Sequence, residues 1–309
     1  MKSKIYLNTD ELIDEILKKG IKINDIDNTK NILKQNNYYV IMGYKHLFLD
    51  DNKKYRDNVC FENIYNLYLF DRNLRLILLE NLLDVENIIK TSIVNHFCSV
   101  YGFTENDYLD KNNYNINHKY IDKTMAIFKS QIAEKEKNHS AITYYKVTYG
   151  FVPFWVVSKI MSFGLLRELY SVMKDDDKEA IKNEISNFTD VKIKHIFTFM
   201  QLFVDMRNRT CHDEILFNEK HKRIILPKLK EHNKFNLSHN NGLNDLLGLL
   251  IIMKNILNKD KYNIMIDRVN NLIINYCKEN NVVSKDALLD EMNLPSNYTQ
   301  LKWKKSQLS

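Results

Sequence analysis

Apolar residues recur every three or four positions over long stretches of this chain, which is the spacing of one face of an α-helix. The longest such stretch covers residues 61–101 and closes at Gly102, and a second, residues 191–206, is apolar on nearly every side. We predict a long amphipathic helix for the first and a buried helix for the second. Because neither apolar surface can stay in contact with water, we expect the two helices to pack together in the core.

Shorter stretches with the same spacing predict further helices, at about residues 118–138, 242–257, 261–277 and 284–292. The 309 residues contain 7 glycines and 3 prolines, too few for the many tight turns of a sandwich or barrel. The sequence therefore predicts an all-α fold. We divide it into an N-terminal helical and aromatic extension (1–60), a helical core (61–235) and a C-terminal helical extension (236–309). No linker separates these parts, so one continuous domain is the alternative.

The cysteines and the apolar runs exclude several classes of protein. The four cysteines are scattered, without the close pairs of a zinc site or the pattern of a disulfide framework: Cys60, Cys98, Cys211 and Cys277. The chain turns polar too early for a signal peptide. Its longest apolar run, 246–253, is far shorter than the roughly 20 residues that span a bilayer. We expect a cytoplasmic protein that needs no metal or cofactor and does not enter a membrane.

Positive charge is concentrated in one segment of the chain. The whole sequence carries a net charge of +6, and residues 218–234 contain six Lys or Arg against two Glu, which gives +4 for that segment. Phosphate contacts supply most non-specific affinity for nucleic acids, so such a run predicts an RNA-binding surface. A solvated helix face is an equally good interpretation of the pattern. The candidate RNA contacts are Lys220, Lys222, Arg223, Lys228 and Lys230.

The candidate catalytic residues lie just before that segment. Arg207 is five positions ahead of His212 and is followed directly by Asn208. Arginine is always charged and its planar fork of donors suits a phosphate. Histidine can both take and give a proton near neutral pH. Cleavage of RNA through its own 2′-hydroxyl requires proton transfer and stabilisation of charge on phosphorus. These residues are therefore candidates for that reaction.

The spacing of the two residues is awkward for a helix. On an ideal helix Arg207 and His212 lie about 140° apart and roughly 7.5 Å along the axis, so they do not share a face. Either the helix breaks at residues 208–210, or the two side chains converge from opposite flanks of a groove. Because Asn and Thr side chains compete for backbone hydrogen bonds, we expect a break there.

The sequence around this pair resembles the Abi-like abortive-infection proteins of the HEPN superfamily, whose signature is Arg-(Asn/Asp/His)-x-x-x-His. The similarity covers Val204 to His212 and the closing Leu216-Phe217-Asn218. Other similar elements are spread over most of the chain: Tyr38-Tyr39 with Gly43-Tyr44, Leu67-Tyr68 with Phe70-Asp71-Arg72, Leu74-Arg75 and Glu86, Pro153-Phe154-Trp155 with Ser162-Phe163-Gly164, and Trp303. The chain departs from the family pattern at Asp213 and Ile215, where many relatives have a second histidine and an arginine.

The resemblance implies a metal-independent endoribonuclease that acts in phage defence or as a toxin, with motifs from two protomers of a homodimer forming one composite site. It implies catalytic roles for three residues and a supporting role for three more: Arg207, Asn208 and His212, and Asp71, Arg72 and Glu86. The i,i+4 spacing of Asp71 and Arg75 alone predicts a local ion pair between them. The alternative function, motivated by the absent second histidine, is a non-catalytic RNA-binding protein on the same scaffold that binds a structured small RNA.

Overall fold

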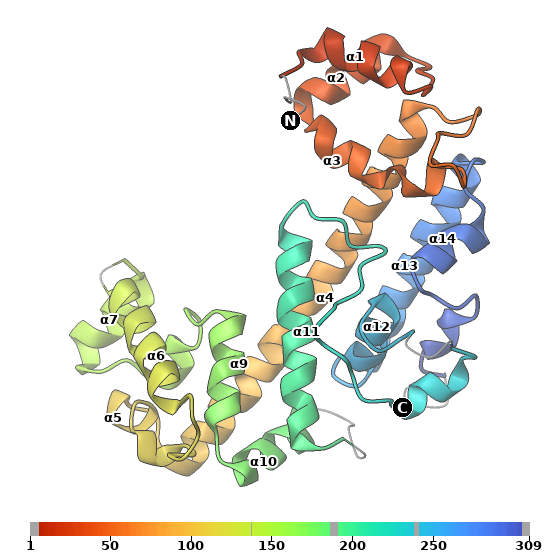
Figure 1. Cartoon of the computed structure of the whole chain (residues 1–309). Helices are drawn as coiled ribbons and strands as arrows, with labels where there is room; N and C mark the ends of the chain where they lie inside the picture. The colour runs from red at the N-terminus through yellow and green to blue at the C-terminus, as the bar shows by residue number, and fades with distance from the viewer. Residues whose placement is uncertain (1–5, 137, 186–190, 238–240, 305–309) are drawn as a thin grey trace.

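The central element of the fold is a single long helix. The structure, a computed structural model, describes residues 6–136, 138–185, 191–237 and 241–304. Helix α4 (Phe61–Tyr101) is 41 residues long and runs through the middle of the molecule (Figure 1). It ends at Gly102, whose φ of 101° is a backbone conformation that residues with a side chain rarely adopt. The predicted helix that closes at Gly102 is confirmed.

Two groups of helices gather at the two ends of α4 and leave an open angle between them (Figure 1). The first group consists of α1 (Thr9–Lys18), α2 (Ile26–Gln35), α3 (Tyr38–Met42) and the 3-10 turn η1 (Gly43–Phe48). The second consists of α5 (Glu105–Tyr108), η2 (Lys111–Asn113), α6 (Ile121–Glu136), α7 (Ser140–Tyr149), α8 (Phe154–Val157), α9 (Phe163–Val172) and α10 (Asp175–Ile185).

The remaining helices cover the sides of α4. Both α11 (Ile193–Cys211) and α13 (Lys259–Glu279) pack directly against it. Around α13 lie α12 (Leu246–Lys254), α14 (Lys285–Glu291) and the 3-10 turn η4 (Tyr298–Leu301), and η3 (Lys230–Lys234) precedes α12. The predicted packing of the two helices with the longest apolar faces, α4 and α11, is therefore confirmed.

The expected helix break at residues 208–210 is wrong, because α11 continues through them to Cys211. The Thr210 hydroxyl donates to the Arg207 carbonyl at 2.7 Å, and this bond forms within the helix instead of competing with it. The backbone becomes extended at the next residue, His212, with φ −105° and ψ 161°. The imidazole therefore lies just beyond the helix that carries the arginine.

The all-α class is confirmed: the described residues contain no strand, and two isolated bridges, Lys22–Cys60 and Leu49–Tyr55, are the β-type pairings among them.

The sequence did not predict α7. Its apolar side chains are largely exposed, with 56% of Tyr144 and 81% of Val147 accessible, so they do not mark a buried face. In the part of the chain that the structure covers, each helix is too short or too polar to cross a membrane.

Candidate functional site

The motif arginine is held against α4. Its Nε lies 3.4 Å from Oε2 of Glu86, and its Nη1 donates to Oδ1 of Asn208 at 3.0 Å. Glu86 is buried, and Lys90 approaches its other oxygen at 3.5 Å. Two neighbours therefore orient Arg207, and the structure brings the predicted supporting residue Glu86 to the motif.

Arg75, also on α4, fastens the turn that follows α11. Its Nη1 donates to the carbonyl oxygens of His212 at 2.9 Å and Glu214 at 3.2 Å, and its Nη2 donates to Oδ1 of Asp213 at 2.6 Å. Only 4% of Arg75 is exposed. A buried guanidinium without such acceptors is strongly destabilising, so these contacts specify the path of the chain after the helix.

Asp71 fastens the residues that come next. Its carboxylate accepts hydrogen bonds from the backbone N–H groups of Leu216 at 3.1 Å and Phe217 at 2.8 Å, and from the Tyr44 hydroxyl at 2.7 Å. Nε of Arg75 lies 3.9 Å away. Complete burial raises the pKa of Asp71 to about 6, although these donors act in the opposite direction. We call Asp71, Arg75 and the 212–217 segment that they hold the loop anchor.

The two departures from the family pattern both pack in the loop anchor. The carboxylate of Asp213 binds Arg75, and the Tyr68 hydroxyl approaches its second oxygen at 3.5 Å. Ile215 packs on Gly43 so closely that a Cβ at that glycine would lie 3.1 Å from its Cδ1. These residues therefore contribute to the position of the loop in this chain.

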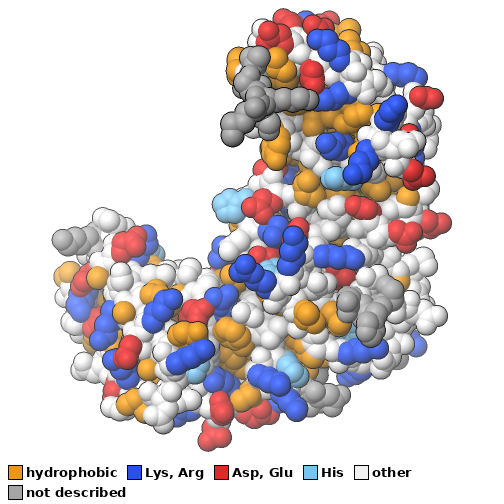
Figure 2. Space-filling model, in the orientation of Figure 1, with side chains coloured by type: hydrophobic (Ala, Val, Ile, Leu, Met, Phe, Trp, Pro, Cys, Tyr) orange, Lys and Arg blue, Asp and Glu red, His pale blue; other side chains and the backbone are white. Residues whose placement is uncertain are grey.

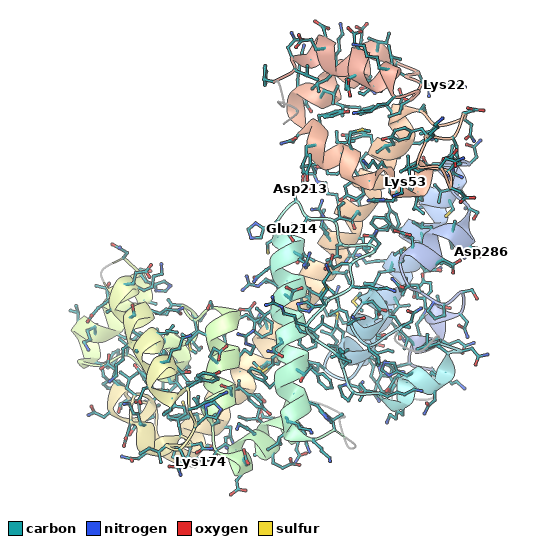
Figure 3. All side chains as sticks on the ribbon, viewed as in Figure 1. Lys22, Lys53, Lys174, Asp213, Glu214 and Asp286 are labelled. Carbon is teal, nitrogen blue, oxygen red and sulfur yellow. The ribbon has the colours of Figure 1, made fainter. Side chains whose placement is uncertain are left out.

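Arg75 and Glu86 hold the two ends of the motif from one face of α4. They are 86 − 75 = 11 residues apart, which is about 1100° and so only ~20° from three full turns. The sticks view places Asp213 and Glu214 at the end of α11, at the inner edge of the open angle (Figure 3), and the space-filling view shows this side of the molecule as a broad concavity (Figure 2). His212, which directly precedes Asp213, is exposed, and so is Asn208.

Two other arginines near the motif have different surroundings. Arg209 contacts three carboxylates at 3.0 to 3.2 Å: Asp205, Glu214 and Glu219. Its charge is therefore used to hold the loop to α11. Arg72 is exposed beside the buried Asp71, and its side chain takes no part in the loop anchor. Of the predicted supporting residues, Glu86 and Asp71 reach the motif region and Arg72 does not.

Residues 31–218 match the family of Abi-like proteins, which is well over half of the chain. This chain belongs to the Abi-like protein family. The matched range contains Arg207, His212 and the complete loop anchor, whereas α12, α13 and α14 lie outside it. Searches of curated proteins and of solved structures gave no match. Family membership associates the protein with abortive infection.

The basic segment of this Abi-like protein is a surface connection. All five predicted RNA contacts are exposed, and the chain is irregular up to η3, which begins at Lys230, so a solvated helix face does not describe most of it. Backbone hydrogen bonds of 2.7 Å, from His221 to Asn244 and from Leu226 to Leu243, fix its course. Lys and Arg side chains gather across the middle of the face shown in Figure 2. Contact with RNA stays a prediction.

Sequence analysis missed the part that Arg75 and Asp213 play in this Abi-like protein. It treated Arg75 as half of a local ion pair, and it saw Asp213 as a missing histidine. The available signal was a pair of opposite charges one turn apart within the longest amphipathic helix of the chain, among apolar residues that are expected to be buried. As for metals, the described residues hold no group of three or more His, Cys, Asp or Glu placed to bind one.

The loop anchor predicts a large difference between two neighbouring arginines. Arg75→Met should lower the free energy of unfolding by about 2–4 kcal/mol, because Asp213 and two carbonyl groups lose their common donor and Asp71 loses a neighbouring positive charge. The matched control is Arg72→Met, one residue after Asp71 on the exposed side of α4, for which we expect a change within about 0.5 kcal/mol. Urea unfolding of both variants measures this. Equal effects would contradict the anchor.

The raised pKa of Asp71 predicts a pH dependence with a definite sign. The folded chain holds this proton more tightly than the unfolded chain, whose carboxyl has the ordinary pKa of 3.8. The resulting stabilisation is complete below about pH 4 and is lost as pH rises through about 6. The unfolding free energy of wild type minus that of Asp71→Asn should therefore fall between pH 4 and pH 7. A difference that grows over that range would refute the shift.

Proposed function

We propose that this Abi-like protein is a metal-independent endoribonuclease of the HEPN kind, which cleaves RNA during abortive infection or as a toxin. The observation that supports it best is the state of the motif: an exposed histidine, fixed through its own backbone carbonyl by Arg75, next to an arginine oriented by Glu86 and Asn208. The concavity in front of it leaves room for a nucleic acid or a second protomer.

The proposed reaction uses the ribose 2′-hydroxyl as the nucleophile. Its oxygen attacks the neighbouring phosphorus while a base takes its proton, and the bond from phosphorus to the 5′-oxygen breaks as an acid protonates that oxygen. His212 serves as the base or as the acid. Arg207 binds the phosphate and stabilises its developing charge, and Asn208 keeps the guanidinium in place. The products are a 2′,3′-cyclic phosphate and a 5′-hydroxyl.

A homodimer supplies the second proton-transfer group. One motif contains a single histidine, whereas the reaction uses an acid and a base. Two motifs related by a two-fold axis provide both, with one His212 in each role and an Arg207 on each side of the phosphate. His212 is exposed and directly precedes Asp213, which lies at the inner edge of the open angle (Figure 3), and this is compatible with such an approach. The basic segment (residues 218–234), which follows the motif in the sequence, then guides the RNA strand.

A non-catalytic RNA-binding protein, which binds a structured small RNA, is the second candidate. Two observations favour it: Asp213 is engaged by Arg75 where many relatives have a second histidine, and the carboxylate of Glu86 already faces Arg207. In this case the basic segment binds RNA and the motif only shapes the surface. The two candidates differ in what the loss of His212 does to cleavage and to binding.

Cleavage assays with purified protein separate the two functions. His212→Ala and Arg207→Ala should each lower RNA cleavage by about 10²–10⁴-fold while RNA binding is retained, and EDTA should leave the wild-type rate unchanged. His46→Ala, at another exposed histidine, is the control and should cleave normally. Cleavage that EDTA stops and Mg²⁺ restores would exclude the proposed mechanism, and unchanged cleavage in both motif variants would favour the RNA-binding protein.

Mixed dimers test the composite site. Wild-type and His212→Ala subunits, joined at known ratios, should give activity that follows the fraction of all-wild-type dimers, which is the square of the wild-type fraction, because each site needs both histidines. Activity is measured as the initial rate of RNA cleavage at several ratios. A rate that falls linearly with the mutant fraction would show that each protomer works alone.

Charge reversal tests the basic segment. Replacing Lys222, Arg223 and Lys228 by Glu should weaken RNA binding and make its dependence on salt shallower, because fewer counterions are released. The melting temperature should barely change, since the three side chains are exposed. Binding isotherms at several salt concentrations provide the slopes. Identical slopes for variant and wild type would leave the segment as a plain solvated surface.

A further inference from the structure

A pocket lined mainly by polar and charged residues lies outside the part of the chain that matches the family. It has a volume of about 660 Å³ and is lined by residues of η3, η4 and the segment after η4: Lys234, Thr299, Gln300, Lys302, Trp303 and Lys304. Half of these residues are lysines and none is acidic. Ligand pockets for small molecules commonly measure ~300–1,000 Å³, so the space suits a molecule of moderate size.

Buried positive charge stands beside this pocket. Nζ of Lys254, at the end of α12, lies 4.4 Å from the centre of the Trp303 ring, and 4% of the residue is exposed. No carboxylate of the described residues forms an ion pair with it. Burial and the neighbouring ammonium groups of Lys234 and Lys230 lower the pKa of Lys254 to about 8, and Glu231 offsets part of this.

Such an arrangement is costly without a bound anion, because like charges repel and a buried ammonium loses its hydration. Lys302 differs, since both oxygens of Asp267 contact it at 2.7 and 2.8 Å. Lys234 and Lys254 form no direct ion pair with a carboxylate of the described chain, and Glu231 offsets only part of their positive charge. An anionic ligand relieves their repulsion.

Trp303 adds an aromatic surface with a free donor. Its indole Nε1–H is buried and has no hydrogen-bond partner among the described residues. Its backbone is fixed on both sides by Asn263, which accepts from its N–H at 2.8 Å and donates to its carbonyl at 3.0 Å. Nζ of Lys259 also lies 5.6 Å from the centre of this ring. An aromatic group that stacks on the fixed ring therefore lies beside ammonium groups.

We propose that this pocket binds a nucleotide, with the base packed against Trp303 and the phosphate near Lys234 and Lys254. Aromatic stacking combined with unbalanced positive charge is the recognition chemistry of a base attached to a phosphate. The pocket is separate from the motif, because η3, η4 and α12 carry neither Arg207 nor His212. The inference therefore goes beyond the proposed ribonuclease and does not depend on it.

Fluorescence of Trp303 tests the proposal. The chain has two tryptophans, so Trp155→Phe leaves Trp303 as the single reporter in the full-length protein. AMP should quench it saturably, with a dissociation constant at least about tenfold below those of adenosine and of inorganic phosphate, a gap of ~1.4 kcal/mol. Adenosine or inorganic phosphate binding as tightly as AMP would overturn the combined base-and-phosphate site.

Three variants complete the test, with calorimetric titration of AMP where Trp303 itself is changed. Lys254→Met keeps the buried alkyl stem while removing the charge, and it should weaken AMP binding at least about tenfold. Trp303→Leu should do the same. The matched control is Lys174→Met, because Nζ of Lys174 lies 4.7 Å from the ring of Tyr101, in the helical group at the far end of α4; it should bind AMP normally.

A six-nucleotide RNA distinguishes the source of the nucleotide. If this RNA binds more tightly than AMP, and Lys254→Met weakens the binding of both ligands, the pocket receives one nucleotide of an RNA strand. If AMP binds as tightly as the RNA, the pocket receives a free nucleotide. Saturable binding of neither AMP nor the RNA up to about 1 mM would overturn the proposal. His212→Ala should bind AMP as wild type does. The nucleotide proposal therefore stands or falls independently of the ribonuclease proposal.

Discussion

The structure of the candidate site depends on one buried cation. Arg75 is almost fully buried on the central helix. Its two terminal nitrogens donate to two backbone carbonyls and to the Asp213 carboxylate of a segment about 140 residues later in the chain. Because leaving this charge unpaired is far more costly than making the contacts, the loop has one favourable course. Asp71 extends the same constraint to Leu216 and Phe217, and Tyr44 ties the N-terminal group to it.

This constraint divides the polar and charged residues of the motif region into two kinds. Those that hold the loop are Arg75, Asp71 and Arg209, whose partners are all within the chain. Those left accessible are His212 and Asn208, next to Arg207, whose carboxylate partner among the described residues is Glu86. The proposed metal-independent cleavage needs a proton-transfer group that is fixed but exposed, and the anchor holds the backbone of His212 while its side chain stays exposed.

The helices that could be predicted from the sequence are those with a continuous buried face, above all α4 and α11, because burial repeats with the period of the helix. The end of α11 was mispredicted, since whether Thr210 bonds inside the helix or against it depends on geometry. The motif, Glu86 and Asp71 came from family resemblance, but the role of Asp213 did not, because its partner Arg75 is 138 residues away. The Lys254–Trp303 pocket joins segments that no local pattern relates.

Amide hydrogen exchange at Leu216 and Phe217 tests the loop anchor most directly. Both N–H groups belong to an irregular segment, yet both donate to a fully buried carboxylate, so they should exchange much more slowly than the amides of the exposed basic segment. Asp71→Ala removes their acceptor and should accelerate both, while Arg72→Met should leave them unchanged. Wild-type exchange at Leu216 and Phe217 as fast as at Lys222 and Arg223 would contradict the account.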